Sequence, residues 1–232
     1  IMNFPILSSL ILLPTIGALF ILFSKTSNKK YQSYKYVALF ISLANFFLSL
    51  YLWFIFDKSS VDFQFLENKE WLAGFVNYKV GVDGISILFI ILTTFITPIC
   101  IISVNATIKN RIKDFLIAIL IMETFMIGVF CSLDLIVFYL FFEAGLIPMF
   151  LIIGIWGGER RVYSAFKFFL YTLLGSVLML IAIISIYWMT GTTDVEVLYE
   201  LGIESKYQNL LWLAFFSSFA VKTPMWPVHT WL

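Results

Sequence analysis

One apolar segment decides which class of fold this chain can form. From Leu135 to Trp156 the sequence runs for 22 residues with a single charge, Glu143, near the middle. At about 1.5 Å rise per residue, such a helix is about 33 Å long and crosses a hydrocarbon core of about 30 Å. Each Leu, Ile, Phe or Val favours insertion by about 0.3 to 0.6 kcal/mol, whereas a central carboxylate costs about 2.5 to 3.5 kcal/mol. The segment is therefore predicted to span a membrane with Glu143 inside it.

The composition of the whole chain indicates the same class of protein. Hydrophobic residues make up 61% of the sequence and charged residues 12%, against about 25% charged residues in a soluble domain. The net charge of +1 gives no indication of nucleic-acid binding. Cys100 and Cys131 lie in apolar runs without a CxxC pattern, so free buried thiols are expected rather than a disulfide framework or a metal site.

Seven apolar segments predict an all-α fold, a polytopic bundle of transmembrane helices that forms one domain over residues 1–232. Charges follow the first segment instead of preceding it, so a cleavable signal peptide is not expected. Asp83 is placed to cap the third helix. The tight turn at 132–134 predicts that spans four and five form an antiparallel hairpin, with Glu123 and Glu143 at similar depth. The predicted spans are 4–23, 36–56, 83–104, 115–133, 135–156, 164–188 and 210–232.

The seventh segment is predicted to be a broken helix. Pro224 and Pro227 follow Lys222 closely, and a proline removes a backbone donor and biases the preceding residue away from helical angles. Thr223 and Trp226 are the expected break points, so the helix should end just past Lys222. A helix C-terminus carries partial negative charge and favours the ammonium there, and interrupted helices with ion sites recur in transporters.

The basic residues orient the predicted bundle. Loops after spans one, three and five hold nine of them, whereas loops after spans two, four and six hold four amid most of the acidic residues. By the positive-inside rule the first set faces the cytoplasm or matrix, which places the N-terminus on the other side. The nine residues are Lys25, Lys29, Lys30, Lys35, Lys109, Arg111, Lys113, Arg160 and Arg161.

Five ionisable residues are candidate functional groups, because charges inside a membrane are costly. Glu123, Glu143 and Lys222 lie within spans, Lys167 in the first turn of span six, and His229 beyond the break. Each also has a structural alternative. Glu143 and Lys222 could form a static ion pair, Lys167 could reach to the interface, Glu123 could bond a neighbouring helix, and His229 could anchor the broken segment. Glycine-rich phosphate loops and nucleophile constellations are absent from the sequence.

Four motifs in order resemble the antiporter-like membrane subunits of proton-pumping NADH:quinone oxidoreductase, respiratory complex I. Within that family, EAGLIPM and the METFM context of Glu123 are most similar to the subunit M branch, called subunit 4 in mitochondria. The motifs are GVDGIS at 81–86, FFEAGLIPM at 141–149, KFFLYT at 167–172 and FAVKTPMWPVHTWL at 219–232.

The resemblance implies a role in proton translocation as part of the NADH:ubiquinone oxidoreductase enzyme. Lys222 is then expected to carry protons, Glu143 to modulate it, Lys167 to relay them and Glu123 to serve as an auxiliary carboxylate, with His229 nearby. NADH, flavin, iron–sulfur and quinone chemistry would reside in other subunits, so no cofactor is expected in this chain. The implied setting is a multi-pass position in the mitochondrial inner membrane or bacterial plasma membrane, in contact with lipid.

The resemblance also sets the expected partners. Family members are about twice as long and contain an inverted repeat, whereas this sequence has no internal repeat. The C-terminal half of the same subunit is therefore an expected partner, either cut off in a fragment or encoded separately by a split gene. Other complex I membrane subunits, including neighbouring antiporter-like subunits, are expected as well. Two alternatives remain: a subunit of a multi-subunit cation/proton antiporter, and a structural anchor that leaves three central charges unexplained.

Overall fold

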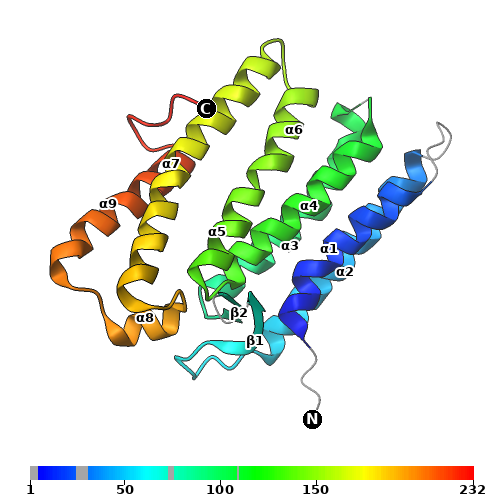
Figure 1. The fold of residues 1–232 in the computed structure, drawn as a ribbon. Coiled ribbons are helices and arrows are strands. Elements are labelled where there is room, and N and C mark those ends of the chain that lie inside the picture. Colours follow the sequence, from blue (N-terminus) through cyan, green and yellow to red (C-terminus); the bar gives the residue numbers. More distant parts are fainter. Residues whose placement is uncertain (1–4, 25–30, 73–75, 109) are drawn as a thin grey trace. The chain divides into compact units, whose positions relative to one another are not determined.

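The computed structural model describes residues 5–24, 31–72, 76–108 and 110–232, and it is mostly helical (Figure 1). The chain divides into two compact units, residues 1–68 with 80–132, and residues 69–79 with 133–232. The helices are α1 (Ile6–Phe23), α2 (Tyr31–Ile55), α3 (Ser86–Thr107), α4 (Ile112–Cys131), α5 (Leu135–Ala144), α6 (Leu146–Trp156), α7 (Arg161–Thr190), α8 (Val195–Leu201) and α9 (Ser205–Lys222). The strands β1 (Gln64–Leu72) and β2 (Val76–Val82) form a two-stranded sheet.

Six segments among the described residues are long and apolar enough to cross a membrane, with α5 and α6 counted as one. They correspond to the first six predicted spans, which confirms a polytopic helical membrane protein. The seventh differs from the prediction, because α9 begins at Ser205, has 18 residues and is not among the six. Its end at Lys222 confirms the predicted break.

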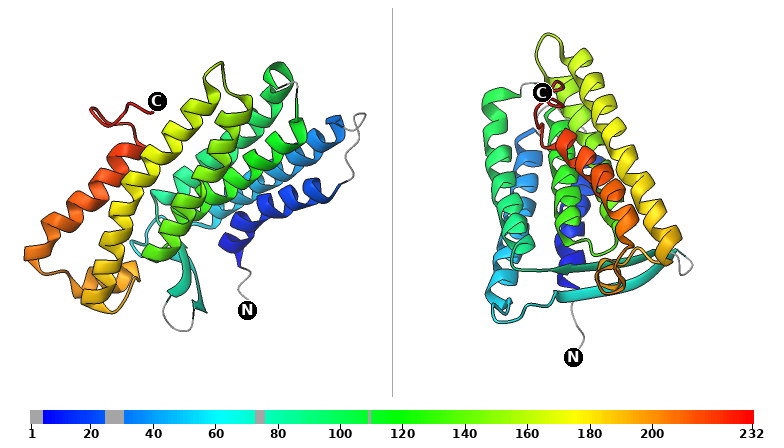
Figure 2. Two further views of the ribbon diagram at one scale, coloured as in Figure 1. Left: turned by 45° about the horizontal axis from the view of Figure 1, so that its top comes forward. Right: turned by 90° about the vertical axis from the view of Figure 1, so that its left-hand side faces the viewer.

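The first unit is built on α1 to α4, which run side by side in Figures 1 and 2. α1 packs against α2 and α4, and α3 packs against the same two helices. A Cβ atom built on Gly17 of α1 would lie 2.5 Å from Ile41 Cδ1 of α2, so the helices approach as closely as glycine allows. Ala18, Ile21 and Leu116 belong to the apolar cluster beside this contact.

The second unit is built on α5, α6, α7 and α9. α7 packs along both α6 and α9, and α5 contacts α6 and α7. A Cβ atom on Gly175 of α7 would lie 3.1 Å from Val221, so a glycine lets α7 approach α9 next to Lys222. Ala182, Ile186 and Leu211 form a further apolar cluster of this unit.

The fifth span is divided, which the sequence analysis does not predict. α5 ends at Ala144 and α6 begins at Leu146, although Gly145 between them keeps near-helical angles of φ −61° and ψ −19°. Pro148 explains the break, because its nitrogen cannot donate to the carbonyl of Ala144 and its ring crowds that carbonyl. The predicted span over 135–156 is confirmed as one membrane-spanning segment, with an interruption at Gly145 that the prediction does not include.

The two polar loops contain regular structure that their sequence does not predict. The loop predicted over 57–82 carries β1 and β2, and the acidic loop 191–209 carries α8 and the start of α9. Glu67 of β1 satisfies the beginning of α1, where its carboxylate accepts hydrogen bonds from Leu7 N at 2.9 Å and from Ser8 Oγ. The bond from Leu7 N satisfies one of the backbone donors that a helix N-terminus leaves without partners.

Several other boundaries differ from the predictions. α2 begins at Tyr31 rather than at 36, and α4 covers Ile112–Cys131 rather than 115–133. α7 begins at Arg161, so Lys167 lies in its second turn, not in the first. The capping role of Asp83 is confirmed, since its Oδ1 accepts from Ser86 N at 2.7 Å.

Some predictions are not tested by these helix positions. The hairpin of spans four and five, the similar depth of Glu123 and Glu143, and the side of the membrane on which each loop lies stay predictions. The residues of the sequence analysis that lie outside the described ranges are Phe4, Lys25, Lys29, Lys30 and Lys109.

Candidate proton-transfer site

Glu143 lies in the last turn of α5 with both carboxylate oxygens shielded from solvent. Within the described part of the chain, neither oxygen has a hydrogen-bond partner. Ser176 of α7 lies beside the carboxylate, but its hydroxyl donates to Leu173 O of its own helix at 2.9 Å. A carboxylate near a helix C-terminus faces partial negative charge, so this position calls for a proton or a cation.

Lys222 is the last residue of α9, and its side chain reaches the end of α5. Its Nζ donates to Phe142 O at 3.3 Å and lies 4.4 Å from the centroid of the Phe142 ring. Phe142 is among the last four residues of α5, whose carbonyls have no partner within that helix. The ammonium thus lies at the C-termini of α5 and α9, and the partial negative charge of both favours it.

Glu143 and Lys222 are close neighbours without forming a closed ion pair. Each lies within electrostatic range of the other. The ion pairs within 4.0 Å in the described ranges, however, join other residues. Lys222 therefore has two alternative partners, the Phe142 carbonyl that it contacts and the nearby Glu143 carboxylate. Such a geometry allows an ammonium to exchange one partner for the other.

The segment after Lys222 folds back onto α7. Trp231 Nε1 donates to Val221 O at 2.8 Å, and its ring lies 5.1 Å from that of Phe168. Lys167 of α7 donates to Thr230 O of the same segment, so it is placed beside the returning chain. The His229 side chain is exposed, while its carbonyl accepts from Leu232 N at 3.0 Å.

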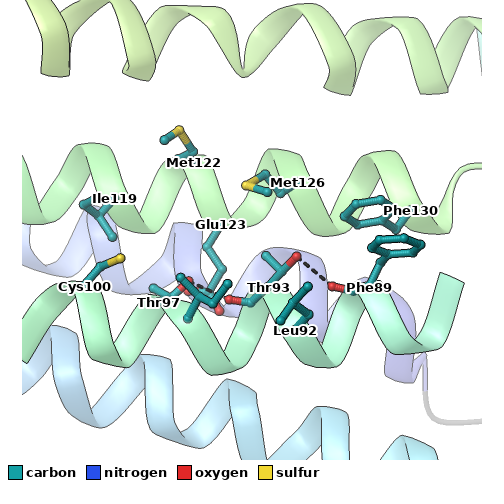
Figure 3. Close-up of a pocket in the computed structure, with 11 residues that line it drawn as sticks. Phe89, Leu92, Thr93, Thr97, Cys100, Ile119, Met122, Glu123, Met126 and Phe130 are labelled. Atoms are coloured by element: carbon teal, nitrogen blue, oxygen red, sulfur yellow. Dashed lines mark hydrogen bonds between the residues drawn. The ribbon is translucent and has the colours of Figure 1, made fainter. Parts of the chain in front are cut away.

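Glu123 belongs to the first unit and is only 2% exposed. Its Oε1 accepts from Asn45 Nδ2 of α2 at 2.9 Å, so the expected bond to a neighbouring helix is present. The side chain lines a cavity of about 220 Å³ and reaches from α4 toward Thr93 and Thr97 of α3 (Figure 3). Asn45 is not predicted as a site residue, although Ser42 and Ser49, at helical spacing from it, indicate a polar face within span two.

A charged cluster of the second unit fixes the start of α5. Lys79 Nζ lies 2.6 Å from Asp194 Oδ2 and 2.5 Å from Glu196 Oε2. Burial disfavours the ammonium, but hydrogen bonds to Asp194 and Glu196 outweigh it and raise the pKa of Lys79. Asp194 also caps α8, and Leu135 N at the start of α5 donates to Thr193 O at 2.9 Å. We call Lys79, Asp194 and Glu196 the lysine clamp.

Among the described residues, no group of three His, Cys, Asp or Glu side chains is arranged to hold a metal ion. Cys100 and Cys131 are free thiols; Cys131 is buried, as expected, whereas Cys100 is only partly buried.

Comparison with known proteins shows which family this chain resembles. Residues 132–232 match the family model described as "NADH:quinone oxidoreductase/Mrp antiporter, TM". The chain is 55% identical over 211 residues to NADH-quinone oxidoreductase subunit M of Rhodobacter capsulatus, covering 85% of this chain and 41% of that protein. It is 49% identical to NADH-ubiquinone oxidoreductase chain 4 of Marchantia polymorpha, covering 97% of this chain and 46% of that protein. The chain belongs to the NADH:quinone oxidoreductase/Mrp antiporter family.

A solved structure supports the family membership. A chain of respiratory complex I from Thermus thermophilus with bound NADH superposes with a TM-score of 0.84 at 30% identity, covering 97% of this chain and 46% of that chain. The present family member spans about half the length of the curated relatives it matches. The resemblance predicted from the four motifs and the multi-pass membrane location are thus confirmed. The roles of the individual site residues stay predictions.

Proposed function

We propose that this chain is part of a proton-translocating membrane subunit of NADH:quinone oxidoreductase. One observation carries the proposal: the Lys222 ammonium contacts the Phe142 carbonyl beside the Glu143 carboxylate, whose shielded oxygens have no hydrogen-bond partner among the described residues. The names of the relatives, subunit M and chain 4 of that oxidoreductase, support it. The proposal makes the chain a subunit of an enzyme that translocates protons.

The proposed mechanism uses the two available partners of Lys222. Burial disfavours the charged forms of Lys222 and Glu143, whereas close approach of the two favours both. When the ammonium moves to Glu143 the pair holds a proton on lysine, and when the pair opens that proton can be released. The titrations of Lys222 and Glu143 are coupled, so measured pKa values would describe the pair rather than either residue. Lys167, bonded to the chain beyond Lys222, would relay protons toward or from the pair.

The proposal assigns the remaining parts of the process to other chains. NADH oxidation and quinone reduction would take place in other subunits, with no redox cofactor in this one. Neighbouring membrane subunits, the C-terminal half of the same subunit, and lipid would complete the surroundings of the helices.

A second candidate is a subunit of a multi-subunit cation/proton antiporter. It is favoured by the family description itself, which names Mrp antiporters beside the oxidoreductase. The partly buried Glu143 and Lys222 would suit either activity.

Co-purification distinguishes the two candidates. The chain would carry an affinity tag in its native host, and the purified material would be assayed for NADH:quinone oxidoreduction, with a tagged unrelated membrane protein as control. The proposal predicts that the activity copurifies with the chain. Material that lacks this activity but exchanges sodium for protons in vesicles would instead assign the chain to an antiporter.

A further inference from the structure

Buried polar residues line up along the membrane-spanning helices α1 to α4 of the first unit, and we call them the polar seam. Ser42, Asn45 and Ser49 on one face of α2 are each 0% exposed. Their spacing of three and four residues places them on one stripe of the helix. The hydrogen bonds that cross between helices are Asn45–Glu123 at 2.9 Å, Ser49–Thr94 at 2.8 Å and Thr15–Thr124 at 2.8 Å.

Glu123 is the one carboxylate among the described residues of this seam, and only one of its two oxygens accepts a hydrogen bond. Asn45 donates to Oε1, whereas Oε2 is shielded from solvent and has no hydrogen-bond partner in the described part of the chain. The ion pairs of the described ranges do not include Glu123. An ionised carboxylate buried with one neutral hydrogen bond and no cation would be strongly unfavourable.

The cavity beside Glu123 offers acceptors rather than donors. Its lining includes Glu123, Thr93, Thr97 and the free thiol of Cys100, a weak donor, among apolar residues such as Phe89 and Met126. Thr93 Oγ1 donates to Phe89 O at 2.8 Å, and Thr97 Oγ1 donates to Thr93 O at 3.0 Å. Both hydroxyl protons are thus engaged, and the oxygens are left with lone pairs. A proton on Oε2 would supply an oxygen-bound donor, which is stronger than the Cys100 thiol.

We propose that Glu123, oriented by Asn45, is a proton-binding site of its own in the α1–α4 unit. Oε1 accepts from the Asn45 amide, Oε2 carries an exchangeable proton, and the Glu123 side chain lines the cavity between α3 and α4. The inference deepens the proposed function, but its test requires neither NADH oxidation nor a proton gradient. A negative result for proton binding at Glu123 is therefore distinguishable from a negative result for the proposed function.

The test uses a hydrophobic carbodiimide on native membranes that contain the full protein. A protonated carboxyl gives its proton to a carbodiimide nitrogen, its oxygen bonds to the central carbon, and the adduct rearranges to a stable N-acylurea. Mass spectrometry of the peptide that contains Glu123 reads the label. We expect labelling at neutral pH that falls as the pH rises, and its complete loss in Glu123→Gln.

Two variants separate proton binding from a merely structural role. Asn45→Leu removes the amide donor, which favours the protonated form, so the half-labelling pH should move upward. Ser49→Ala removes a different hydrogen bond of the same seam and should leave that pH unchanged. A water-soluble carbodiimide, which enters an apolar cavity poorly, should label the exposed Glu200 instead.

Infrared spectroscopy of the same membranes keeps the inference falsifiable if the reagent cannot enter. A carboxylic-acid C=O band that shifts in D₂O and disappears in Glu123→Gln would support the proposal. Absence of both the band and the label would overturn it. Suppression of labelling by sodium at constant pH and ionic strength would also overturn it, because the cavity would then hold a metal cation.

Discussion

At the scale of single residues, Lys222 is placed by the ends of two helices. Its ammonium contacts a carbonyl in the last turn of α5, and it terminates α9 itself. The sequence identifies Lys222 and Glu143 as candidate functional residues and predicts the end of α9, because charges within apolar segments and prolines can be read directly from it. The Phe142 carbonyl and Asn45 could not be predicted, since a backbone partner has no sequence signature and Asn45 acquires its role only from the packing of α2 on α4.

Gly175 provides a prediction at this scale. A Cβ atom there would lie 3.1 Å from Val221, the neighbour of Lys222. Gly175→Leu should overpack the contact of α7 with α9 and destabilise the protein by about 1 to 3 kcal/mol. The thermal midpoint of the purified assembly in detergent measures this, with Gly158→Ala as control because nothing lies within 4 Å of that position. Failure of Val221→Ala to relieve a milder Gly175→Ala defect would contradict the account.

At the scale of elements, the apolar spans follow from composition, whereas short elements depend on distant partners. α8 begins where Asp194 caps it, and Asp194 is held by Lys79 from 115 residues earlier in the chain. β1 holds Glu67, which caps α1. These contacts are nonlocal, so a local pattern cannot reveal them. The division at Gly145 is different, because Pro148 carries the signal within the segment.

The lysine clamp predicts a pH dependence of stability. The pKa of Lys79 in the folded state lies above its ordinary value of 10.5. The lysine clamp therefore stabilises the folded state fully below pH 10.5, and this stabilisation is lost as the pH rises through the folded-state pKa of Lys79. The thermal midpoint of the wild type should therefore decrease as the pH is raised above 10.5. The thermal midpoint of Lys79→Arg, whose side chain keeps its charge at alkaline pH, should decrease less. Lys79→Met should have a lower thermal midpoint than the wild type already at pH 7. Equal alkaline loss in wild type and Lys79→Arg would assign the effect to other groups.

At the scale of the whole molecule, the basic residues predict its orientation in the membrane. Residues 57–80 and 191–209 should lie on the side opposite 24–35 and 157–163. In a background without Cys100 and Cys131, single cysteines at Glu159 and Glu200, both exposed, should react with an impermeant maleimide from opposite sides of sealed vesicles. Reaction of both from the same side would contradict the predicted orientation.

The central claim concerns proton movement by Glu143 and Lys222. Removing one partner of a buried pair leaves the other uncompensated, at a cost of about 3 to 5 kcal/mol unless the survivor changes protonation. Glu143→Gln and Lys222→Ala should therefore pump far fewer protons while the assembly still forms. Glu143→Asp should retain partial activity, because the charge survives at shorter reach.

The most direct measurement is the proton gradient formed per NADH oxidised, in vesicles that contain equal amounts of assembled wild-type or variant protein. The account predicts a steep fall in this gradient for Glu143→Gln and Lys222→Ala, and an intermediate value for Glu143→Asp. Wild-type pumping in both Glu143→Gln and Lys222→Ala would show that the two residues only hold helices together.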